Sequence, residues 1–325
     1  MVEIREYVKV IREFPGVTRK NAIHEVVDLF PTSGFPKVVA AEGEDAAVIE
    51  CGNTCVLFAA DGIMEKLVEA DPFLAGYYAV LVNVNDIAAM GGRPLGMVDV
   101  LSMNKGAVES ELIRGIRAGV EKFNVPIVGG HTHPDCNYSS IDISIIGEVR
   151  KEDVLLSSTA RPGDDIVFVM DLEGRFPESV PYTFDTTTGR SDDLVQAQLE
   201  AVAVIAERHI AHSCKDMSNP GHVGTLGMML ESSSAGATVD VTRIPIPDGV
   251  DPLTWATAYM GCGFVISCDP AHSQEIIDLF GQVGCAGSVV GKVDDTKVLK
   301  LTDGKDMAVL FDFNKDIITG VKIKK

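Results

Sequence analysis

Asn83-Val84-Asn85-Asp86-Ile87-Ala88-Ala89-Met90-Gly91-Gly92 is the stretch of this sequence that decides the fold. It closes an apolar segment that begins at about residue 71, and the spacing predicts a helix over 71–90. The polar side chains of Asn83, Asn85 and Asp86 interrupt an otherwise apolar run. Charged and amide groups in such a place are candidates for a binding site at the edge of a sheet or helix.

Runs of strand length lie on both sides of this helix. The sequence predicts strands within VVAAEGEDAAVIECG (38–52), TCVLFAADG (54–62), VPIVGGH (125–131) and SSIDISIIGEV (139–149), with the alternation clearest in the last. An apolar stripe predicts a further helix over 109–123. Two short helices are predicted within residues 1–30, where Pro15-Gly16 marks a break.

The segment 157–164, Ser-Ser-Thr-Ala-Arg-Pro-Gly-Asp, is the best candidate for a linker, because small polar residues and Pro-Gly precede a new buried strand at 166–170. We therefore expect two domains of mixed α+β class, over 1–156 and 157–325. In the second domain, 174–190 is predicted to be a long surface loop of the kind used for substrates. A helix is predicted over 192–209, and a glycine-rich segment follows at 219–227.

The composition excludes several classes of function. The chain has 325 residues, is 46% hydrophobic and carries a formal net charge of -19. Such a charge would repel a phosphate backbone, so nucleic-acid binding is disfavoured. Seven scattered cysteines without a C-x-x-C pair predict reduced thiols, and the absence of a signal peptide or a long apolar run predicts a cytoplasmic protein without a membrane span.

Aspartates at the ends of apolar runs are the candidates for chemistry. Asp45, Asp61 and Asp86 each lie at or beside such an end, and carboxylate oxygens are the ligands that magnesium prefers when it also binds phosphate. A nucleotide could approach so acidic a chain only with divalent cations between them. For Asp61 alone, which precedes Gly62, an Asx turn is the competing interpretation.

Two familiar nucleotide-binding motifs are absent from the chain. The sequence contains no G-x-x-x-x-G-K-[ST] and no G-x-G-x-x-G. Neither a P-loop nor a Rossmann dinucleotide fold is therefore expected.

The motifs together resemble the aminoimidazole ribonucleotide synthetase (PurM-like) superfamily. The resembling segments are Gly43-Glu44-Asp45-Ala46-Ala47-Val48 (G-D-D-A-A-V), Ala60-Asp61-Gly62 (T-D-G), the stretch 83–92 (N-x-x-D-I-A-A-M-G-G), Gly129-Gly130-His131-Thr132 (G-G-D-T), Ala160-Arg161-Pro162-Gly163-Asp164 (A-R-P-G-D), Asp216-Met217-Ser218-Asn219 (D-I-S-D) and Met260-Gly261-Cys262-Gly263-Phe264 (M-G-x-G-[MF]). The resemblance spans about Lys37 to Asp294. The family also contains thiamine-monophosphate kinase, selenophosphate synthetase and the hydrogenase-maturation carbamoyl dehydratase.

The resemblance implies an N-terminal ATP-binding domain that forms a homodimer across its sheet, and a C-terminal α/β sandwich-like domain. It implies ATP and Mg²⁺ as cofactors and a small molecule as substrate. The positions carried over are Asp45, Asp61 and Asp86 as metal ligands, and Asp45, Asn83, Gly91, Gly130 and Thr132 as ATP contacts. His131 and Asp216 are the candidates for orienting or deprotonating the acceptor, and Arg161 and Lys215 are either anion contacts or surface charges.

Two positions depart from the family pattern. His131 replaces an aspartate, and a nitrogen donor is a poor magnesium ligand, while Asn219 replaces a second acid. His131 with His133 could chelate a transition metal, although a hydrogen-bonding or phosphate-contacting role is favoured. No cysteine precedes Lys37 to handle selenide. His131 and the run that begins at Asp216 resemble the group called methanogenesis marker protein 2.

Three functions follow as hypotheses. The leading one is a kinase or a synthetase of cyclo-ligase type that transfers the γ-phosphoryl group of ATP, with Mg²⁺, to an oxygen of a small molecule, such as one used in cofactor biosynthesis. The second is a catalytically altered, nucleotide-binding assembly or maturation factor, which the two lost acids motivate. The third is metal handling through His131, His133 and Cys136. The methionines at 217, 228, 229 and 260 are interpreted as core packing.

Overall fold

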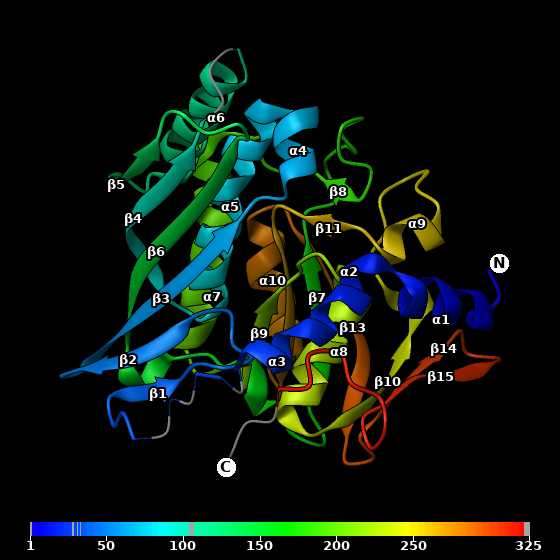
Figure 1. Cartoon of the computed structure of the whole chain (residues 1–325). Helices are drawn as coiled ribbons and strands as arrows, with labels where there is room; N and C mark the ends of the chain where they lie inside the picture. The colour runs from blue at the N-terminus through cyan, green and yellow to red at the C-terminus, as the bar shows by residue number, and fades with distance from the viewer. Residues whose placement is uncertain (1, 28, 31, 33, 104–106, 322–325) are drawn as a thin grey trace.

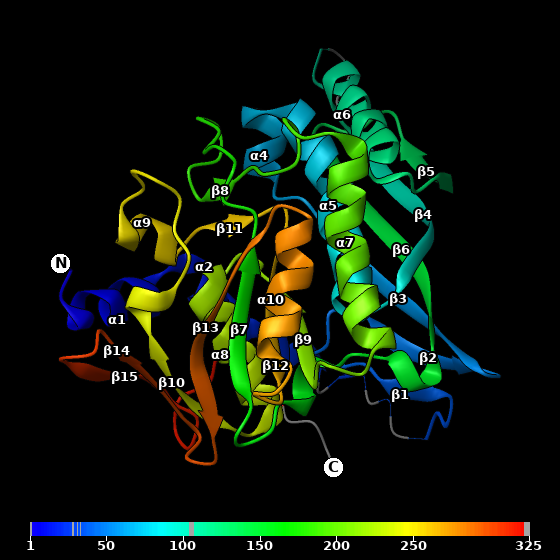
Figure 2. The same cartoon turned by 180° about the vertical axis from the view of Figure 1, so that it is seen from behind.

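Two large β-sheets, each covered by helices, and a small two-stranded sheet make up the described part of the chain (Figures 1 and 2). This computed structural model describes residues 2–27, 29–30, 32, 34–103 and 107–321. The first sheet is built from residues 38–150 and the second from residues 165–312. The α+β class with two sheet-containing domains is thus confirmed.

The first sheet has six strands in the order β1-β2-β3-β6-β4-β5. Its strands are β1 (Val38–Ala40), β2 (Ala47–Cys51), β3 (Thr54–Gly62), β4 (Arg93–Ser102), β5 (Ile127–His133) and β6 (Ser140–Arg150). All neighbours are antiparallel except β4 and β5, which run parallel and leave β5 at the edge. Ile141, Ile143 and Ile145 of β6 face the core and are at most 1% exposed, as their alternation predicts.

Helices α5 (Pro72–Ala89) and α6 (Ala107–Phe123) cover one face of this sheet, and Figure 2 shows them in front of the strands. The two helices touch through glycines. A Cβ at Gly115 would lie 1.9 Å from the Phe73 carbonyl oxygen, and one at Gly76 would lie 2.2 Å from that of Leu112. Any larger residue would force the helices apart, so the glycines fix how closely α5 packs.

The second sheet has seven strands in the order β15-β14-β10-β13-β7-β12-β9. The strands are β7 (Asp165–Met170), β9 (Ser213–Asp216), β10 (Gly236–Asp240), β12 (Gly263–Cys268), β13 (Ala286–Asp294), β14 (Val298–Thr302) and β15 (Met307–Asp312). Both faces are buried. Ile166 and Phe168 of β7 belong to one apolar core, and Val167 and Val169 belong to the other.

Helices lie on both sides of this second sheet. Helices α7 (Asp192–Glu207) and α10 (Ser273–Gln282) pack on one face, and α8 (Gly221–Ser233) with α1 (Ile4–Glu13) packs on the other. The remaining elements are α2 (Pro15–Thr18), η1 (Arg19–Ala22), α3 (Ile23–Val27), α4 (Glu65–Ala70), η2 (Lys151–Asp153), η3 (Ser157–Thr159), β8 (Thr183–Phe184), η4 (Val241–Arg243), α9 (Pro252–Ala256) and β11 (Tyr259–Met260).

The predicted helices over 71–90, 109–123 and 192–209 and the predicted strands are present, but three features differ from the expectations. Strand β4 (93–102) was not among the predicted strands. The segment 174–190 is not a surface loop throughout, because residues 183–187 are buried and β8 pairs with β11. The glycine-rich stretch 221–227 lies in helix α8, where Gly227 approaches Ile318 closely.

The N-terminal helix does not pack with the first sheet. Ile4, Tyr7 and Ile11 of α1 join the apolar core formed by β7, α8 and β14. The chain therefore starts on the second sheet and crosses to the first through α2, η1 and α3. A division at 156/157 stays a prediction.

Helix length and apolarity bear on membrane association. Within the described part of the chain, every helix is too short or too polar to span a bilayer.

Candidate functional site

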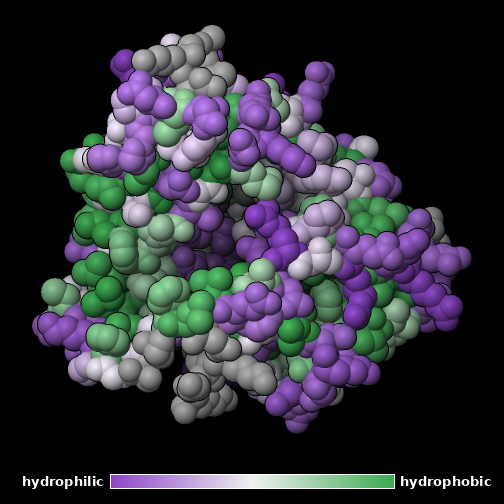
Figure 3. Space-filling model, in the orientation of Figure 1, coloured by the Kyte–Doolittle hydropathy of each residue, from purple (hydrophilic) through white to green (hydrophobic). Residues whose placement is uncertain are grey.

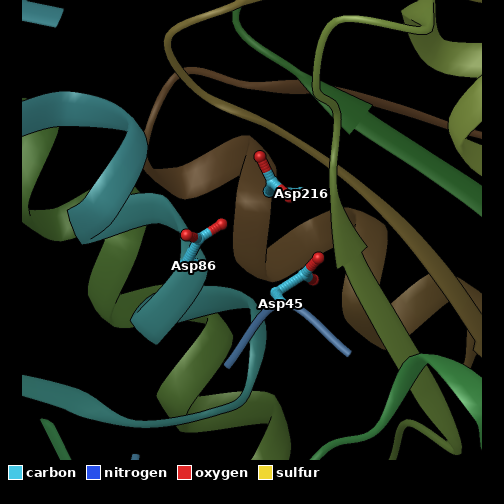
Figure 4. Close-up of side chains that lie close together, drawn as sticks. All are labelled: Asp45, Asp86 and Asp216. Carbon is cyan, nitrogen blue, oxygen red and sulfur yellow. The ribbon is translucent and has the colours of Figure 1, made fainter. Parts of the chain in front are cut away.

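Three carboxylates from distant parts of the chain meet between the two sheets. Asp45, Asp86 and Asp216 each place an oxygen within 4.8 Å of the others, and Figure 4 shows the three side chains around one common space. We call these three residues the acid cluster. Among the described residues, the acid cluster is the one group of three or more Asp, Glu, His or Cys side chains whose ligand atoms lie close enough together to hold a metal ion.

Each member of the acid cluster comes from a different element. Asp45 lies in the loop between β1 and β2, Asp86 lies on α5, and Asp216 ends β9 at the edge of the second sheet. Two acids thus come from the first domain's segment and one from the second. On the face of the molecule that Figure 1 shows, Figure 3 shows a hollow between the two sheets that is lined mostly by hydrophilic residues.

Asp45 is held in place from both sides. The ammonium group of Lys215 donates a hydrogen bond to Asp45 Oδ1, and both side chains are buried. Next to it, Glu44 accepts hydrogen bonds from the Ser157 amide (2.5 Å) and the Ser158 hydroxyl (2.6 Å). Asp45 Oδ2 remains buried without a hydrogen-bond partner, which is costly for a carboxylate oxygen unless a ligand completes it.

Two asparagines position α5 beside the cluster. The side-chain oxygen of Asn83 accepts from the Asp61 amide (3.2 Å), and its amide group donates to the Ala79 carbonyl (2.8 Å). Asn85 donates to the Gly261 carbonyl (2.8 Å) on the second sheet's side. Asn83 therefore ties α5 to the end of β3, and Asn85 ties α5 to the second domain's segment.

Burial and mutual repulsion shift the titration of the cluster. Burial, followed by the negative charge of Asp45, raises the pKa of Asp216 to about 7. Burial and the charge of Asp216 raise the pKa of Asp86 well above its usual range. Carboxylates that repel each other in this way bind a cation favourably, because the cation relieves the repulsion.

Two lysines lie among these acids. Burial alone would lower the pKa of Lys215, but the carboxylates of Asp45 and Asp216 raise it above its ordinary value. Burial and the charge of Lys215 lower the pKa of Lys20, whose charge also acts on Asp61 and Asp216. Lys20 comes from η1, so the N-terminal segment contributes a positive group to the site.

Asp61 lies near the acid cluster without belonging to it. Burial raises its pKa, and the charge of Asp45 adds to the rise, so the two carboxylates are close enough to repel. Asp61 and Gly62 continue β3 and pair with Ile143 and Asp142, so no Asx turn forms there, and a Cβ at Gly62 would lie 2.1 Å from Asp142 Oδ1. As a metal ligand Asp61 stays a prediction.

Gly130, His131 and Thr132 lie on the edge strand β5. The register aligns Asp61 with Ile143, Ile143 with Asp99 and Asp99 with Gly130. Three strand spacings thus separate β3 from β5, or about 14 Å. Gly130, His131 and Thr132 could contact a nucleotide bound at the acid cluster only if the nucleotide extended across the sheet, or if these residues came from a second copy of the chain.

Gly91, the pair His131 and His133, and Arg161 were also site candidates in the sequence, and packing or an exposed position accounts for them. Gly91 has φ +75°, and a Cβ there would lie 2.7 Å from Ala206 Cβ, so packing alone requires the glycine. The His131 and His133 rings pack edge to face at 4.6 Å, but among the described residues they form no three-ligand metal group with Cys136. Arg161 is exposed in a turn that Asp164 closes.

The sequence did not assign Asp216 to the metal or show that the charges of Lys215 and Lys20 act on it. Asp216 follows a short buried strand, as Asp61 does, and that shared position was the available signal. Lys20 carries no local signal, because only the packing of η1 brings its charge near Asp61 and Asp216.

Two family models match the chain. AIR synthase related protein, N-terminal domain, matches residues 43–149, and AIR synthase related protein, C-terminal domain, matches residues 179–304. The acid cluster draws on both matched regions, since Asp45 and Asp86 lie in the first and Asp216 in the second.

Curated relatives match most of the chain. An uncharacterized protein of Methanocaldococcus jannaschii is 44% identical over 98% of this chain and 100% of its own length. Another, of Synechocystis, is 32% identical over 86% of each. The selenide, water dikinase of a Geobacter species is 26% identical over 72% of this chain and 69% of its own length.

Solved structures share the fold. Thermotoga maritima PurL, complexed with ADP, superposes with a TM-score of 0.78 at 18% identity, over 95% of this chain and 51% of that one. AaThiL complexed with AMPPCP and TMP has a TM-score of 0.66 at 19% identity, over 87% and 94%. This chain thus spans about half the length of PurL and nearly all of AaThiL.

Proposed function

The chain belongs to the AIR synthase related protein family, and from that premise we propose that it transfers the γ-phosphoryl group of ATP to an oxygen of a small molecule with the help of Mg²⁺. The family includes enzymes that use ATP, such as the selenide, water dikinase. PurL and AaThiL, which share the fold, have been solved with ADP and AMPPCP. The acid cluster is the observation that carries the proposal.

The residues of the acid cluster fit a hard divalent cation. Three carboxylates converge, and Asp45 Oδ2 is buried with no protein partner. Oxygen ligands of this kind suit Mg²⁺, which is usually bound by one or two carboxylates together with substrate phosphates. Mg²⁺ bound there would supply positive charge that offsets the charge on the triphosphate.

The chain's own residues do the positioning. Lys215 fixes Asp45 through a buried ion pair, and Asn83 fixes the end of β3 against α5. Lys20 and the exposed Arg19 place positive groups on the N-terminal side, where they are suited to contact phosphate oxygens. Preorganised charges of this kind lower the barrier to phosphoryl transfer without any movement at the moment of reaction.

Asp216 has two alternative roles in this proposal. It is either the third oxygen ligand of the cation or the base that deprotonates the acceptor, for which a pKa of about 7 is suitable. Asp216→Asn separates the roles. Loss of cation binding identifies a ligand, whereas retained MgATP binding without turnover identifies a base.

A homodimer across the first sheet forms part of the proposal. The face of the sheet that α5 and α6 leave uncovered carries apolar side chains on three neighbouring strands and the edge strand. Phe58, Val98, Val100, Val128 and Ile146 are 42% to 72% exposed there. Figure 3 shows hydrophobic residues gathered over these strands. A contiguous apolar face of this kind is typical of a protein interface.

Calorimetric titration of ATP tests the function. The protein should bind ATP in the presence of Mg²⁺ and not in the presence of a chelator. Asp86→Asn should weaken binding at least tenfold, because it removes a ligand and its charge. Asp278→Asn, which alters an exposed carboxylate on α10, should leave binding unchanged. Equal affinity in Asp86→Asn and the wild type would refute the proposal.

The second candidate is an assembly factor that binds nucleotide without turnover, as the acids replaced by His131 and Asn219 suggest. ADP release that depends on Mg²⁺ and on an added acceptor would exclude it. Similarity to the methanogenesis marker group, and with it a part in cofactor biosynthesis, stays a prediction.

A further inference from the structure

A pocket of about 230 Å³ opens at the end of the molecule away from the first sheet. Five elements of the second domain and the N-terminus enclose it: α1, α8, the segment from η4 to Ile246, α9 and the turn between β14 and β15. Figures 1 and 2 both show α1, α9, β10 and β14 on the side opposite β3–β6. None of the residues that line it belongs to the acid cluster.

The walls of the pocket are mostly apolar and partly aromatic. They include Tyr7, Val241, Ile244, Ile246 and Trp255. Trp255 is 2% exposed and donates its indole N–H to the Pro245 carbonyl (2.8 Å), so its ring is fixed with no free donor. Apolar walls with few polar groups are typical of sites for small organic molecules.

His222 is one of the few polar side chains that line the pocket, with Thr242 and Asp303. Its side chain is 1% exposed, and neither ring nitrogen has a hydrogen-bond partner. The backbone of Trp255 acts on the ring as a weak hydrogen-bond partner, although the pair does not meet strict hydrogen-bond geometry. Buried polar atoms are nearly always paired in native proteins, so an imidazole in a pocket wall with at least one nitrogen left unpaired indicates a missing partner.

Charge and size define what this partner can be. Burial keeps the imidazole uncharged, so it offers one donor and one acceptor but no charge. The charged residue that lines the pocket is Asp303, an acid that would repel an anion. An ionic group would also lose its hydration against the apolar walls. A cavity of about 150 Å³ can hold benzene, so the present volume suits one substituted ring or a small fused pair.

We propose that this pocket binds an uncharged, ring-containing small molecule that forms a hydrogen bond with the imidazole of His222. The ring would lie among Tyr7, Ile244 and Trp255, and a hydroxyl or ring N–H would complete His222. The site is independent of the acid cluster, so its existence does not depend on the phosphoryl-transfer proposal.

The test compares two molecules of nearly the same shape, p-cresol and p-xylene, which differ by a hydroxyl in place of a methyl group. Trp255 is the one tryptophan of the chain, so its fluorescence reports on the pocket. We expect saturable binding of both probes, with p-cresol about five- to tenfold tighter because of the hydrogen bond. In His222→Leu the preference should reverse in favour of p-xylene, because the hydroxyl of p-cresol would be buried without a hydrogen-bond partner.

Two further variants complete the experiment. Ile246→Phe enlarges a half-exposed side chain at the rim and should weaken both probes, so it serves as the test if His222→Leu does not fold. Met228→Leu, elsewhere on α8, should change neither affinity and serves as the control. The proposal is overturned if neither probe binds saturably to the wild type, if both bind it equally, if p-cresol keeps its advantage in His222→Leu, or if Ile246→Phe changes nothing.

Discussion

His222 is a neutral imidazole in an apolar surrounding, and its protonation should destabilise the fold. Burial lowers its pKa from 6.5 to about 4. The folded state therefore releases this proton more readily than the unfolded state, so the contribution to stability is complete above pH 6.5 and is lost as the pH falls toward 4. Between pH 7 and pH 5 the loss should be roughly 2 kcal/mol.

Urea unfolding at the two pH values measures this loss against His222→Leu. The difference in unfolding free energy between wild type and variant should shift by that amount in favour of the variant at the lower pH. A difference that stays constant with pH would show that His222 is not held neutral in the folded protein.

Residue by residue, the sequence identified part of the acid cluster. Asp45 and Asp86 were predicted because each lies beside the end of an apolar run, and the structure brings them together. Asp216 was expected near the acceptor, and its place among the acids depends on how β9 packs beside α5. Lys215 was left open between anion contact and surface charge, because nothing local tells that its ammonium group is buried against Asp45.

At the scale of elements, the contact between α5 and α6 sets the position of Asp86. Gly115 on α6 lies against the Phe73 carbonyl, where a Cβ would approach to 1.9 Å. Gly115→Ala should therefore reduce the unfolding free energy by about 1–3 kcal/mol, the usual cost of overpacking. Gly281→Ala on α10, where a Cβ meets nothing within 4 Å, is the matched control and should stabilise by up to about 1 kcal/mol.

Chemical denaturation of the two glycine variants decides whether close helix packing matters. If Gly115→Ala is as stable as Gly281→Ala, the helices tolerate separation and the position of α5 has another cause.

Elements with regular periodicity were predictable, and the others depended on tertiary pairing. Strand β6 alternates cleanly, whereas the register of β4 against β6 shifts between Pro94 and Gly96, which disrupts the period of β4. Glycines in 221–227 obscured α8, which forms because it is packed on every side. The segment 183–187 contains polar residues but is buried, where β8 pairs with β11 and the Asp185 carboxylate accepts from the Thr187 and Thr188 amides.

At the scale of the whole molecule, the uncovered face of the first sheet should join two copies. Val98 lies on this face between Ser144 and Gly129, and its side chain is partly exposed. Val98→Glu would place an unpaired charge in the interface, so the dimer should weaken by at least tenfold in dissociation constant. Val309→Glu, on the exposed side of β15, is the control and should leave the dimer intact.

Sedimentation equilibrium measures the association of these variants. A wild type that remains monomeric at all concentrations would contradict the proposed dimer, and so would equal dissociation constants for Val98→Glu and Val309→Glu.

The two domains together should hold divalent cations, since Asp45 and Asp86 come from one and Asp216 from the other. Crystals grown with Mn²⁺ and a non-hydrolysable ATP analogue would locate such ions through the anomalous scattering of manganese. We expect a manganese peak among these three carboxylates, in contact with the terminal phosphates. Manganese or nucleotide bound elsewhere, with the three carboxylates left unliganded, would contradict it.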